Sequence, residues 1–236
     1  MSLPVAVLAG GLATRLRPLT DRVPKILLEV AGRPFAEHQV ELLRAQGIRH
    51  VVFCVGHLGE QVEQTLGDGR RWGMRFQYVF DGPRLAGTGG AVRRALPLLG
   101  PSFFVMYGDA YLPCDFGAVE RAFVRSGAPG LMVVFPNDDR WDRSNVQLEQ
   151  GRIVRYDKAA RDGPMRHIDY GLSVLTPEAF APWLDETSPL DLEAVYQRLV
   201  ARGELAAYEV GQRFYEIGSH EGLEETRALL QGRGMA

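Results

Sequence analysis

Short apolar runs alternate with helical patterns through the first 136 residues of the chain. Residues 3–9, 48–55 and 103–107 are apolar runs of strand length, and a glycine follows each of them directly. Helical patterns lie between the runs, such as the one that begins after Pro34 and ends at Gly47. Strands that are apolar at nearly every position are typical of a parallel sheet with helices on both faces. The sequence therefore predicts an α/β fold with a doubly wound, mostly parallel, Rossmann-like sheet.

The pattern changes after residue 137. Residues 145–149 and 152–156, joined at Gln150-Gly151, predict a small antiparallel hairpin inserted in the second half, and residues 168–175 predict a further strand. No Pro/Ser-rich linker or internal repeat separates the two halves. We therefore expect a single domain over residues 1–236.

Two glycine-rich segments of the first half are predicted as loops. Residues 10–24 follow the first apolar run and lead into a short extended piece over residues 25–30. Residues 87–90 precede a helical pattern over residues 91–98.

The charge balance narrows the class of protein. The chain has 29 acidic and 27 basic residues and a formal net charge of -2, whereas general nucleic-acid binders carry a basic excess. The longest early apolar run, residues 5–9, is too short for a membrane span or a signal-peptide core. The two cysteines, Cys54 and Cys114, cannot form a disulfide framework of the secreted kind. We expect a cytoplasmic protein without membrane or nucleic-acid partners.

The basic residues are unusual in kind. Only Lys25 and Lys158 are lysines, and the other 25 basic residues are arginines. A lysine retained against this bias suggests a position that needs a compact ammonium rather than a planar guanidinium.

The first glycine loop has the composition of a phosphate site. It lies at the carboxyl edge of the predicted sheet, where its backbone N–H groups can turn toward phosphate oxygens and Arg15 can add a bidentate contact. A plain turn with solvated arginines would look similar. The loop is neither a Walker loop nor a dinucleotide fingerprint, because it lacks both Gly-Lys-Ser/Thr and the third glycine.

The longer string around this loop is Leu8-Ala9-Gly10-Gly11-x-x-Thr14-Arg15-Leu16-x-Pro18-Leu19-Thr20, followed by Pro24-Lys25. This string resembles the signature of the sugar nucleotidyltransferase (nucleoside-diphosphate-sugar pyrophosphorylase) family. The resemblance implies a Rossmann-like nucleotidyltransferase fold. It also implies that the glycine backbone and Arg15 hold a nucleoside triphosphate while Lys25 reaches the phosphates at the reaction centre. The residues it assigns to the nucleotide in this loop are Leu8, Ala9, Gly10, Gly11, Thr14 and Arg15. Ala13 stands where the family usually has glycine.

Further motifs follow the same family pattern. Gly87 and Thr88 belong to a second glycine segment, which the resemblance places against the nucleobase. Gly108 and Asp109 end a buried strand, and a carboxylate at this edge can hold Mg²⁺, although a turn cap is the commoner use of aspartate. By resemblance Asp109 is the first Mg²⁺ ligand and Glu216, at a position where the family normally has aspartate, is the second.

The sugar phosphate is assigned to the second half of the chain. Lys158 resembles the family's lysine that grips this phosphate, so both lysines fall on phosphate positions. The resemblance places Asn145, Asp157, Asp169 and Gly171 around the sugar. It implies a nucleotide-binding half over about residues 1–136 and a sugar-phosphate-binding half over about residues 137–236.

The implied activity is transfer of a nucleotide to a sugar 1-phosphate with release of pyrophosphate. Short bacterial enzymes that use GTP with heptose- or mannose-type 1-phosphates are the preferred comparison, because no Gln stands near Gly87. A UTP-dependent enzyme of the N-acetylmuramate or glucose type, a non-catalytic sugar-nucleotide-binding subunit and a redox Rossmann domain stay open as alternatives. A homodimer is also open.

Overall fold

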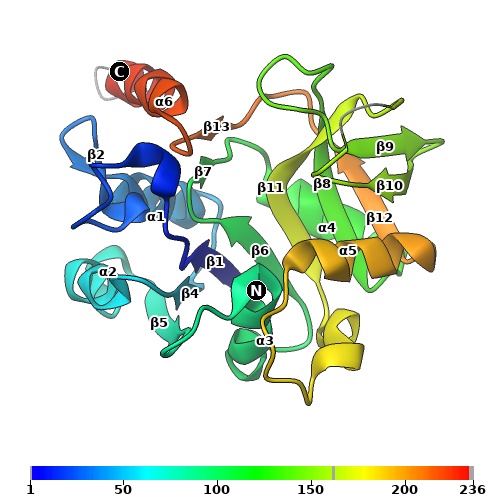
Figure 1. Cartoon of the computed structure of the whole chain (residues 1–236), viewed down its shortest axis with the longest axis horizontal. Helices are drawn as coiled ribbons and strands as arrows, with labels where there is room; N and C mark the ends of the chain where they lie inside the picture. The colour runs from blue at the N-terminus through cyan, green and yellow to red at the C-terminus, as the bar shows by residue number, and fades with distance from the viewer. Residues whose placement is uncertain (1, 161–162, 234–236) are drawn as a thin grey trace.

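A sheet of nine strands runs through the computed structural model, which describes residues 2–160 and 163–233 (Figure 1). Within these residues the strands lie in the order β5-β4-β1-β6-β11-β8-β12-β10-β9. In chain order the strands are β1 (Val5–Ala9), β4 (His50–Val55), β5 (Arg75–Phe80), β6 (Phe103–Tyr107), β8 (Gly130–Pro136), β9 (Val146–Glu149), β10 (Arg152–Tyr156), β11 (His167–Leu175) and β12 (Leu205–Glu209).

Two small sheets and a set of helices surround the large sheet. The small sheets pair β2 (Glu29–Val30) with β3 (Arg33–Pro34), and β7 (Ala110–Tyr111) with β13 (Tyr215–Glu216). The α-helices are α1 (Phe35–Ala45), α2 (Gly59–Leu66), α3 (Gly87–Leu99), α4 (Phe116–Ser126), α5 (Leu192–Ala201) and α6 (His220–Arg233). The 3₁₀ helices are η1 (Thr14–Leu16), η2 (Lys25–Leu27), η3 (Arg70–Trp72) and η4 (Pro177–Trp183).

The first four strands of the sheet confirm the α/β prediction. β5, β4, β1 and β6 are parallel, and Val7 of β1 lies in register with Phe53 of β4 and Met106 of β6. The connections between these strands carry α1, α2 and α3, as parallel neighbours require. Because their carboxyl ends meet at one edge, the loops that follow β1 and β6 lie side by side.

The prediction of a mostly parallel sheet is wrong, because the sheet is mixed. Among the described strands, four neighbouring pairs are parallel, whereas β11 is antiparallel to both β6 and β8, and β10 is antiparallel to β9 and β12. The chain leaves β8 and enters β11 without a crossover helix, so β11 starts at the edge where β8 ended and must run back. The predicted hairpin is present as β9 and β10 at one end of the sheet.

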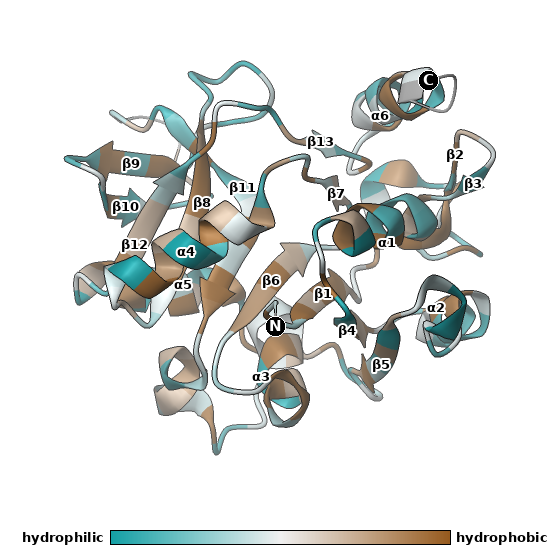
Figure 2. Cartoon of the chain, turned by 180° about the vertical axis from the view of Figure 1, so that it is seen from behind, coloured by the Kyte–Doolittle hydropathy of each residue, from teal (hydrophilic) through white to brown (hydrophobic). Residues whose placement is uncertain are grey.

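Both faces of the sheet are buried, as expected for a doubly wound fold. Side chains alternate along β1, with Val5 and Val7 in the core on one face and Ala6 in the core on the other. Helices α1, α2, α4 and α6 contribute to the first core, and α3, α5 and η4 to the second. Strands β1, β6 and β8 are accordingly apolar along most of their length, while β10 and the helices also carry polar stretches (Figure 2).

Three local elements differ from the sequence prediction. Residues 87–90 are not a loop but the first turn of α3, and residues 25–27 form a 3₁₀ turn rather than extended chain. Strand β12 has no counterpart in the prediction, because its alternating small residues gave only a weak apolar signal.

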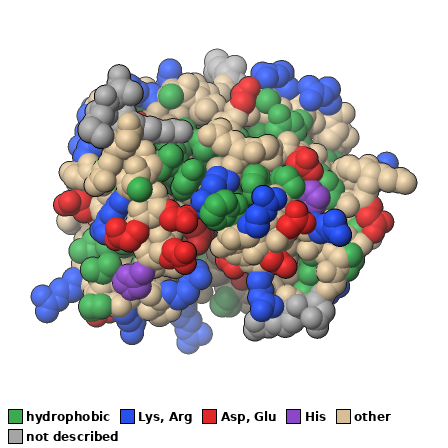
Figure 3. Space-filling model, turned by 90° about the horizontal axis from the view of Figure 1, so that it is seen from above, with side chains coloured by type: hydrophobic (Ala, Val, Ile, Leu, Met, Phe, Trp, Pro, Cys, Tyr) green, Lys and Arg blue, Asp and Glu red, His purple; other side chains and the backbone are tan. Residues whose placement is uncertain are grey.

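The outer surface shows no strong bias of charge on the face seen in Figure 3, where basic and acidic side chains are interspersed. None of the helices in the described part of the chain has the length and apolar character needed to cross a membrane.

The glycines that begin α3 allow it to pack against the segment before α5. A Cβ at Gly87 would lie 2.4 Å from the carbonyl oxygen of Leu190, and one at Gly89 would lie 2.9 Å from the Leu190 side chain. The same segment is hydrogen-bonded to the helix start, since Gly90 N–H donates to Leu190 O and Leu190 N–H donates to Ala86 O. Close packing therefore explains these glycines without reference to a ligand.

We expect Gly87→Ala to destabilise the protein more than Gly100→Ala. The two residues stand at opposite ends of α3 with φ of +74° and +75°, but nothing lies within 4 Å of a Cβ at Gly100. Gly100→Ala should cost about 1–2 kcal/mol for the left-handed backbone alone. Gly87→Ala should cost about 1–3 kcal/mol more, because the methyl group overlaps Leu190. Urea unfolding of the two variants measures the difference, and equal losses would contradict the packing explanation.

Candidate active site

A pocket of about 550 Å³ opens at the carboxyl ends of β1 and β6. Most of the predicted site residues line it: Leu8, Ala9, Gly10, Gly11, Arg15, Lys25, Gly87, Thr88, Gly108, Asp109, Asn145, Lys158, Asp169, Gly171 and Glu216. Thr14 and Asp157 are not among the lining residues. The Asp157 carboxylate instead pairs with Arg155 at 2.8 Å and accepts the backbone N–H groups of residues 159 and 160.

Several internal hydrogen bonds hold the first loop in its turn, among them Leu16 N–H to Ala13 O at 3.1 Å and Leu19 N–H to Leu16 O at 2.9 Å. Thr20 Oγ1 donates to the carbonyl oxygen of Ala13 at 2.9 Å. Ala13 itself has φ 47° and ψ 42°, the left-handed conformation that costs an alanine more than a glycine. The loop therefore keeps, with alanine, a backbone shape that glycine would adopt without strain, and it presents Arg15 at the pocket.

Asp109 is fixed by the backbone of two neighbouring strands. Gly108 N–H donates to Leu8 O at 3.0 Å, and a Cβ at Gly108 would lie 2.4 Å from the same oxygen, so this approach requires glycine. Buried Gln39 of α1 donates its side-chain amide to Ala110 O at 2.7 Å on the other side of Asp109.

Lys25 and Asp109, which both line the pocket, form a direct ion pair. Lys25 Nζ lies 2.5 Å from Asp109 Oδ2, and the two side chains are only 21% and 22% exposed. The pair brings together two residues that are 84 positions apart in the sequence.

Glu216 reaches Asp109 through the pairing of β7 and β13. Glu216 lies in register with Ala110, and Ile217 N–H donates to Asp109 O at 2.9 Å. Both carboxylates approach Gly218, where a Cβ would lie 3.1 Å from Glu216 Oε1 and 3.4 Å from Asp109 Oδ2. Burial, together with the negative charge of Asp109, raises the pKa of Glu216 to about 6.

The two carboxylates fit a single Mg²⁺. Among the described residues no three His, Cys, Asp or Glu side chains gather into a group that could hold a metal alone. Mg²⁺ is commonly bound by one or two carboxylates and completes its shell with water and substrate phosphates. Burial is the main cause of the raised Glu216 pKa, and the repulsion from Asp109 that adds to it is one that a bound cation would offset.

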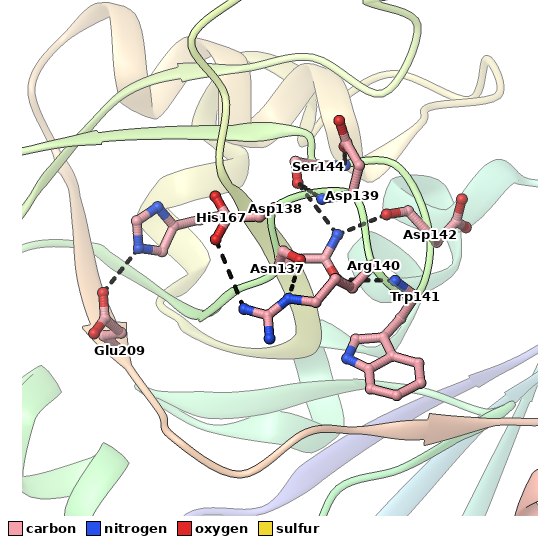
Figure 4. Close-up of polar contacts among 9 residues, drawn as sticks. All are labelled: Asn137, Asp138, Asp139, Arg140, Trp141, Asp142, Ser144, His167 and Glu209. Carbon is pink, nitrogen blue, oxygen red and sulfur yellow. Dashed lines mark hydrogen bonds and ion pairs between the residues drawn. The ribbon is translucent and has the colours of Figure 1, made fainter.

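The loop of residues 137–145 forms another part of the wall and is organised around Asn137 (Figure 4). This side chain is fully buried; its amide donates to Asp142 O and Ser144 Oγ, and its oxygen accepts from Trp141 N–H. The loop carries Asp142, Arg143 and Asn145 into the pocket wall. Asp142 and Arg143 were not predicted, because nothing in the local sequence marks them apart from other surface charges.

Arg213 connects this loop to the strand that carries Glu216. Its guanidinium lies 3.4 Å from the ring centre of Trp141 and 4.4 Å from that of Tyr215, within the range of cation–π attraction. It also pairs with Glu225 of α6 at 2.6 Å. The loop, β13 and α6 are therefore joined through one side chain.

Lys158 also lines the pocket, within a hydrogen-bonded cluster. Its ammonium donates to Tyr107 Oη at 3.2 Å, and Tyr107 in turn donates to Asp169 Oδ2 at 2.7 Å. Tyr156 donates to the same carboxylate oxygen at 2.9 Å. Asn145 Oδ1 accepts the backbone N–H of Asp169. The two tyrosines had no predicted role.

Two further polar residues line the pocket. The Thr88 hydroxyl makes hydrogen bonds within the protein, and Asp81 is a carboxylate that the sequence analysis did not assign to the site. Thr88 Oγ1 accepts Leu192 N–H at 2.8 Å and donates to Asp191, so it helps to begin α5. Asp81 is 6% exposed, and its Oδ2 would lie 3.3 Å from a Cβ at Gly10. Burial raises the pKa of Asp81, although the Ala86 N–H and Arg94 favour the charged form.

Cys54 also lines the pocket, but it is not a nucleophile. Burial and the neighbouring charge of Asp81 raise the pKa of its thiol to about 12. Neither it nor Cys114, whose pKa is raised in the same way, forms a reactive thiolate near neutral pH.

The sequence model described as nucleotidyl transferase matches residues 5–231, which span both walls of the pocket. The chain belongs to this nucleotidyl transferase family. Two curated relatives are the N-acetylmuramate alpha-1-phosphate uridylyltransferase of Neisseria meningitidis and the mannose-1-phosphate guanyltransferase beta-B of Xenopus laevis. The first is 41% identical over 116 residues, covering 48% of this chain and 49% of the relative. The second is 29% identical over 221 residues, covering 90% of this chain and 60% of the relative.

A solved structure shows the same fold over nearly the whole chain. The inositol-1-phosphate CTP transferase from T. maritima superposes with a TM-score of 0.81 at 23% identity, covering 98% of this chain and 96% of its own. The chain spans only about half to three fifths of the length of its two curated relatives.

We expect Asp109→Asn and Glu216→Gln each to weaken Mn²⁺ binding, with Mn²⁺ as the probe for a divalent cation. Losing one of two carboxylate ligands should lower the affinity by about tenfold or more, which is 1.4 kcal/mol or more. Electron paramagnetic resonance of free Mn²⁺ gives the affinity without any turnover. Asp157→Asn, a carboxylate change outside the pocket, is the control. Wild-type Mn²⁺ affinity in Glu216→Gln would remove Glu216 from the metal site.

Proposed function

We propose that the protein is a sugar-1-phosphate nucleotidyltransferase. An oxygen of the sugar phosphate attacks the α-phosphorus of a bound nucleoside triphosphate in line with the leaving group, and pyrophosphate departs with the bonding electrons. The observation that carries the proposal is the convergence of Lys25, Asp109 and Glu216 in a pocket that Lys158 also lines. Membership of the nucleotidyl transferase family supports it.

The site residues supply position and charge rather than covalent chemistry. The backbone of Gly10 and Gly11 and the guanidinium of Arg15 would hold the triphosphate. Asp109 and Glu216 would hold one Mg²⁺, which would offset the negative charge of the phosphates. Lys25, held by its ion pair with Asp109, would stabilise the charge that develops on pyrophosphate. Lys158 would hold the phosphate of the sugar.

We assign the two halves of the chain to the two substrates. Residues from about 1 to 136 provide the glycine loop, Asp81 and Asp109, and we assign this half to the nucleotide. Residues from about 137 to 236 provide Asn145, Tyr156, Lys158 and Asp169, and we assign this half to the sugar phosphate, although Tyr107 of the first half contacts both Lys158 and Asp169. Glu216 crosses the boundary, because β13 pairs with β7 of the first half.

The base is proposed to be guanine, with a heptose- or mannose-type 1-phosphate as the sugar substrate. Asp81 supports this choice, since a carboxylate accepts hydrogen bonds and guanine offers adjacent N1–H and N2–H donors on one edge. Uracil offers a single N–H between two carbonyl acceptors, which a carboxylate would repel. The match to a mannose-1-phosphate guanyltransferase over 90% of the chain agrees with this choice. The shorter match to a uridylyltransferase favours UTP as the second candidate.

A matrix of nucleoside triphosphates against sugar 1-phosphates, scored by pyrophosphate release, tests both parts of the proposal. We expect turnover with GTP and mannose 1-phosphate or a heptose 1-phosphate, and about tenfold or more weaker turnover with UTP, the effect of one lost base contact. Asp81→Asn should lower the ratio of turnover with GTP to turnover with UTP. Binding without pyrophosphate release would instead support a non-catalytic subunit, and preference for UTP with N-acetylmuramate 1-phosphate would move the assignment to the uridylyltransferases.

We expect Lys25→Arg and Lys158→Arg both to impair the enzyme, although each keeps the positive charge. A guanidinium is larger and planar, and it cannot replace a compact ammonium between phosphate oxygens. Lys25→Arg should mainly lower kcat by about tenfold or more, because its partner charge grows in the transition state. Lys158→Arg should mainly raise the KM for the sugar phosphate, because its contact is made equally in the ground state. Steady-state kinetics separate the two effects. Normal rates in both variants would show that neither lysine needs to be a lysine for activity, and that both act as solvated surface residues.

A further inference from the structure

Hydrogen bonds hold Lys158 both at its backbone and at its ammonium. Its backbone N–H donates to the carboxylate of Glu193 in α5 at 2.9 Å, and its ammonium donates to Tyr107 Oη at 3.2 Å. The ammonium lies 5.1 Å from the ring centre of Tyr107 and 5.8 Å from that of Tyr156, within cation–π range of both. A free lysine side chain has many rotamers, and these contacts select a few of them.

The carboxylate of Asp169 already accepts three hydrogen bonds from the protein itself. Its Oδ2 accepts the hydroxyl groups of Tyr107 and Tyr156 at 2.7 Å and 2.9 Å, and its Oδ1 accepts Gly171 N–H at 2.9 Å. The residue is only 9% exposed. A carboxylate with three protein donors has little capacity left for the hydroxyl groups of a sugar.

The Tyr107 hydroxyl has a single proton, and this proton determines which groups donate and which accept hydrogen bonds in the cluster. Tyr107 donates this proton to Asp169, so its oxygen can only accept from Lys158. Burial, reinforced by the charge of Asp169, raises the pKa of Tyr107 and Tyr156 well above the ordinary value, so both phenols keep their protons. The ammonium has three N–H donors and spends one on Tyr107, which leaves two for a ligand.

We propose that Tyr107 is a positioning residue for Lys158, and that Asp169 acts by orienting the Tyr107 hydroxyl rather than by binding the sugar. The proposal rests on the assignment of Lys158 to the phosphate monoester of the sugar substrate. A neutral hydroxyl between Asp169 and Lys158 holds the ammonium in place without a direct carboxylate contact. The contrast is with Lys25, whose ammonium meets Asp109 directly at 2.5 Å. A lysine paired directly with a carboxylate would give up part of its attraction for phosphate.

The two-lysine composition allows a test that needs no turnover. Lysine labelled with ¹³C at the ε carbon gives one NMR signal each for Lys25 and Lys158, and Lys158→Arg assigns them. In the wild type the Lys158 ε protons should be shifted by the two neighbouring rings. Tyr107→Phe keeps the ring but removes the acceptor oxygen, so the Lys158 signal should move toward that of free lysine while the Lys25 signal stays. A wild-type Lys158 signal in Tyr107→Phe would overturn the proposal.

Tyr196→Phe is the matched control for this experiment. Tyr196 is 2% exposed and packs against the Tyr156 ring, but its hydroxyl pairs with Ser173 Oγ at 2.7 Å and not with Asp169. Removing this buried hydroxyl should leave the Lys158 signal at its wild-type position. If Tyr107→Phe proves too unstable to study, Asp169→Asn is the second variant. It keeps the shape of the side chain, and the proposal requires that the Lys158 signal again move toward free lysine.

Kinetics with GTP and mannose 1-phosphate distinguish positioning from general structural damage. Tyr107→Phe should raise the KM for mannose 1-phosphate roughly tenfold, the effect of one hydrogen bond to a charged group. The KM for GTP should change little. In the Lys158→Ala background the same change should have no further effect, since coupled residues are not additive. Equal effects of Tyr107→Phe with and without Lys158 would overturn the proposal. If the wild type releases no pyrophosphate, the proposed function fails, and the NMR signal still decides the role of Tyr107.

Discussion

The pairing of two very short strands determines where the charges of the pocket meet. β7 and β13 contribute two residues each, yet they set Glu216 opposite Ala110 and bring its carboxylate to Asp109. This arrangement opposes two like charges in a partly buried place, and the raised Glu216 pKa records the cost. Lys25 offsets part of that cost from the other side. The glycine loop, which follows β1, and the loop of residues 137–145 line the same pocket.

The two lysines illustrate how one cation type can be held in two ways. Lys25 meets a carboxylate directly, whereas Lys158 meets a tyrosine whose hydroxyl is turned by a carboxylate. The first arrangement keeps the ammonium beside the residues that we assign to the metal. The second leaves more of the charge available to an incoming anion. In a chain that uses arginine for every other basic side chain, this difference agrees with distinct demands at the two positions.

Most of the helices and strands could be predicted from the sequence, because apolar periodicity and glycine turns are local signals. Strand direction could not, since β11 runs antiparallel only because no helix carries the chain back across the sheet. The glycines at 87–90 were misread as a loop, although packing against Leu190 requires them within a helix. Family likeness pointed to most of the residues that line the pocket. It could not reveal Tyr107, Tyr156 or Asp81, whose importance depends on neighbours that are distant in the sequence.

Arg213 gives the last helix a part in the pocket that its position would not suggest. In Figure 1 α6 lies at the margin of the molecule, beyond strand β13. Its Glu225 nevertheless holds the guanidinium that is stacked between Trp141 and Tyr215, and its Thr226 donates to the carbonyl oxygen of Glu216. Through these two contacts α6 helps to hold the pocket residues in place, although the helix does not line the pocket. Whatever shifts α6, such as a neighbouring domain or a second subunit, would pull on both the loop of residues 137–145 and the Glu216 carboxylate at once.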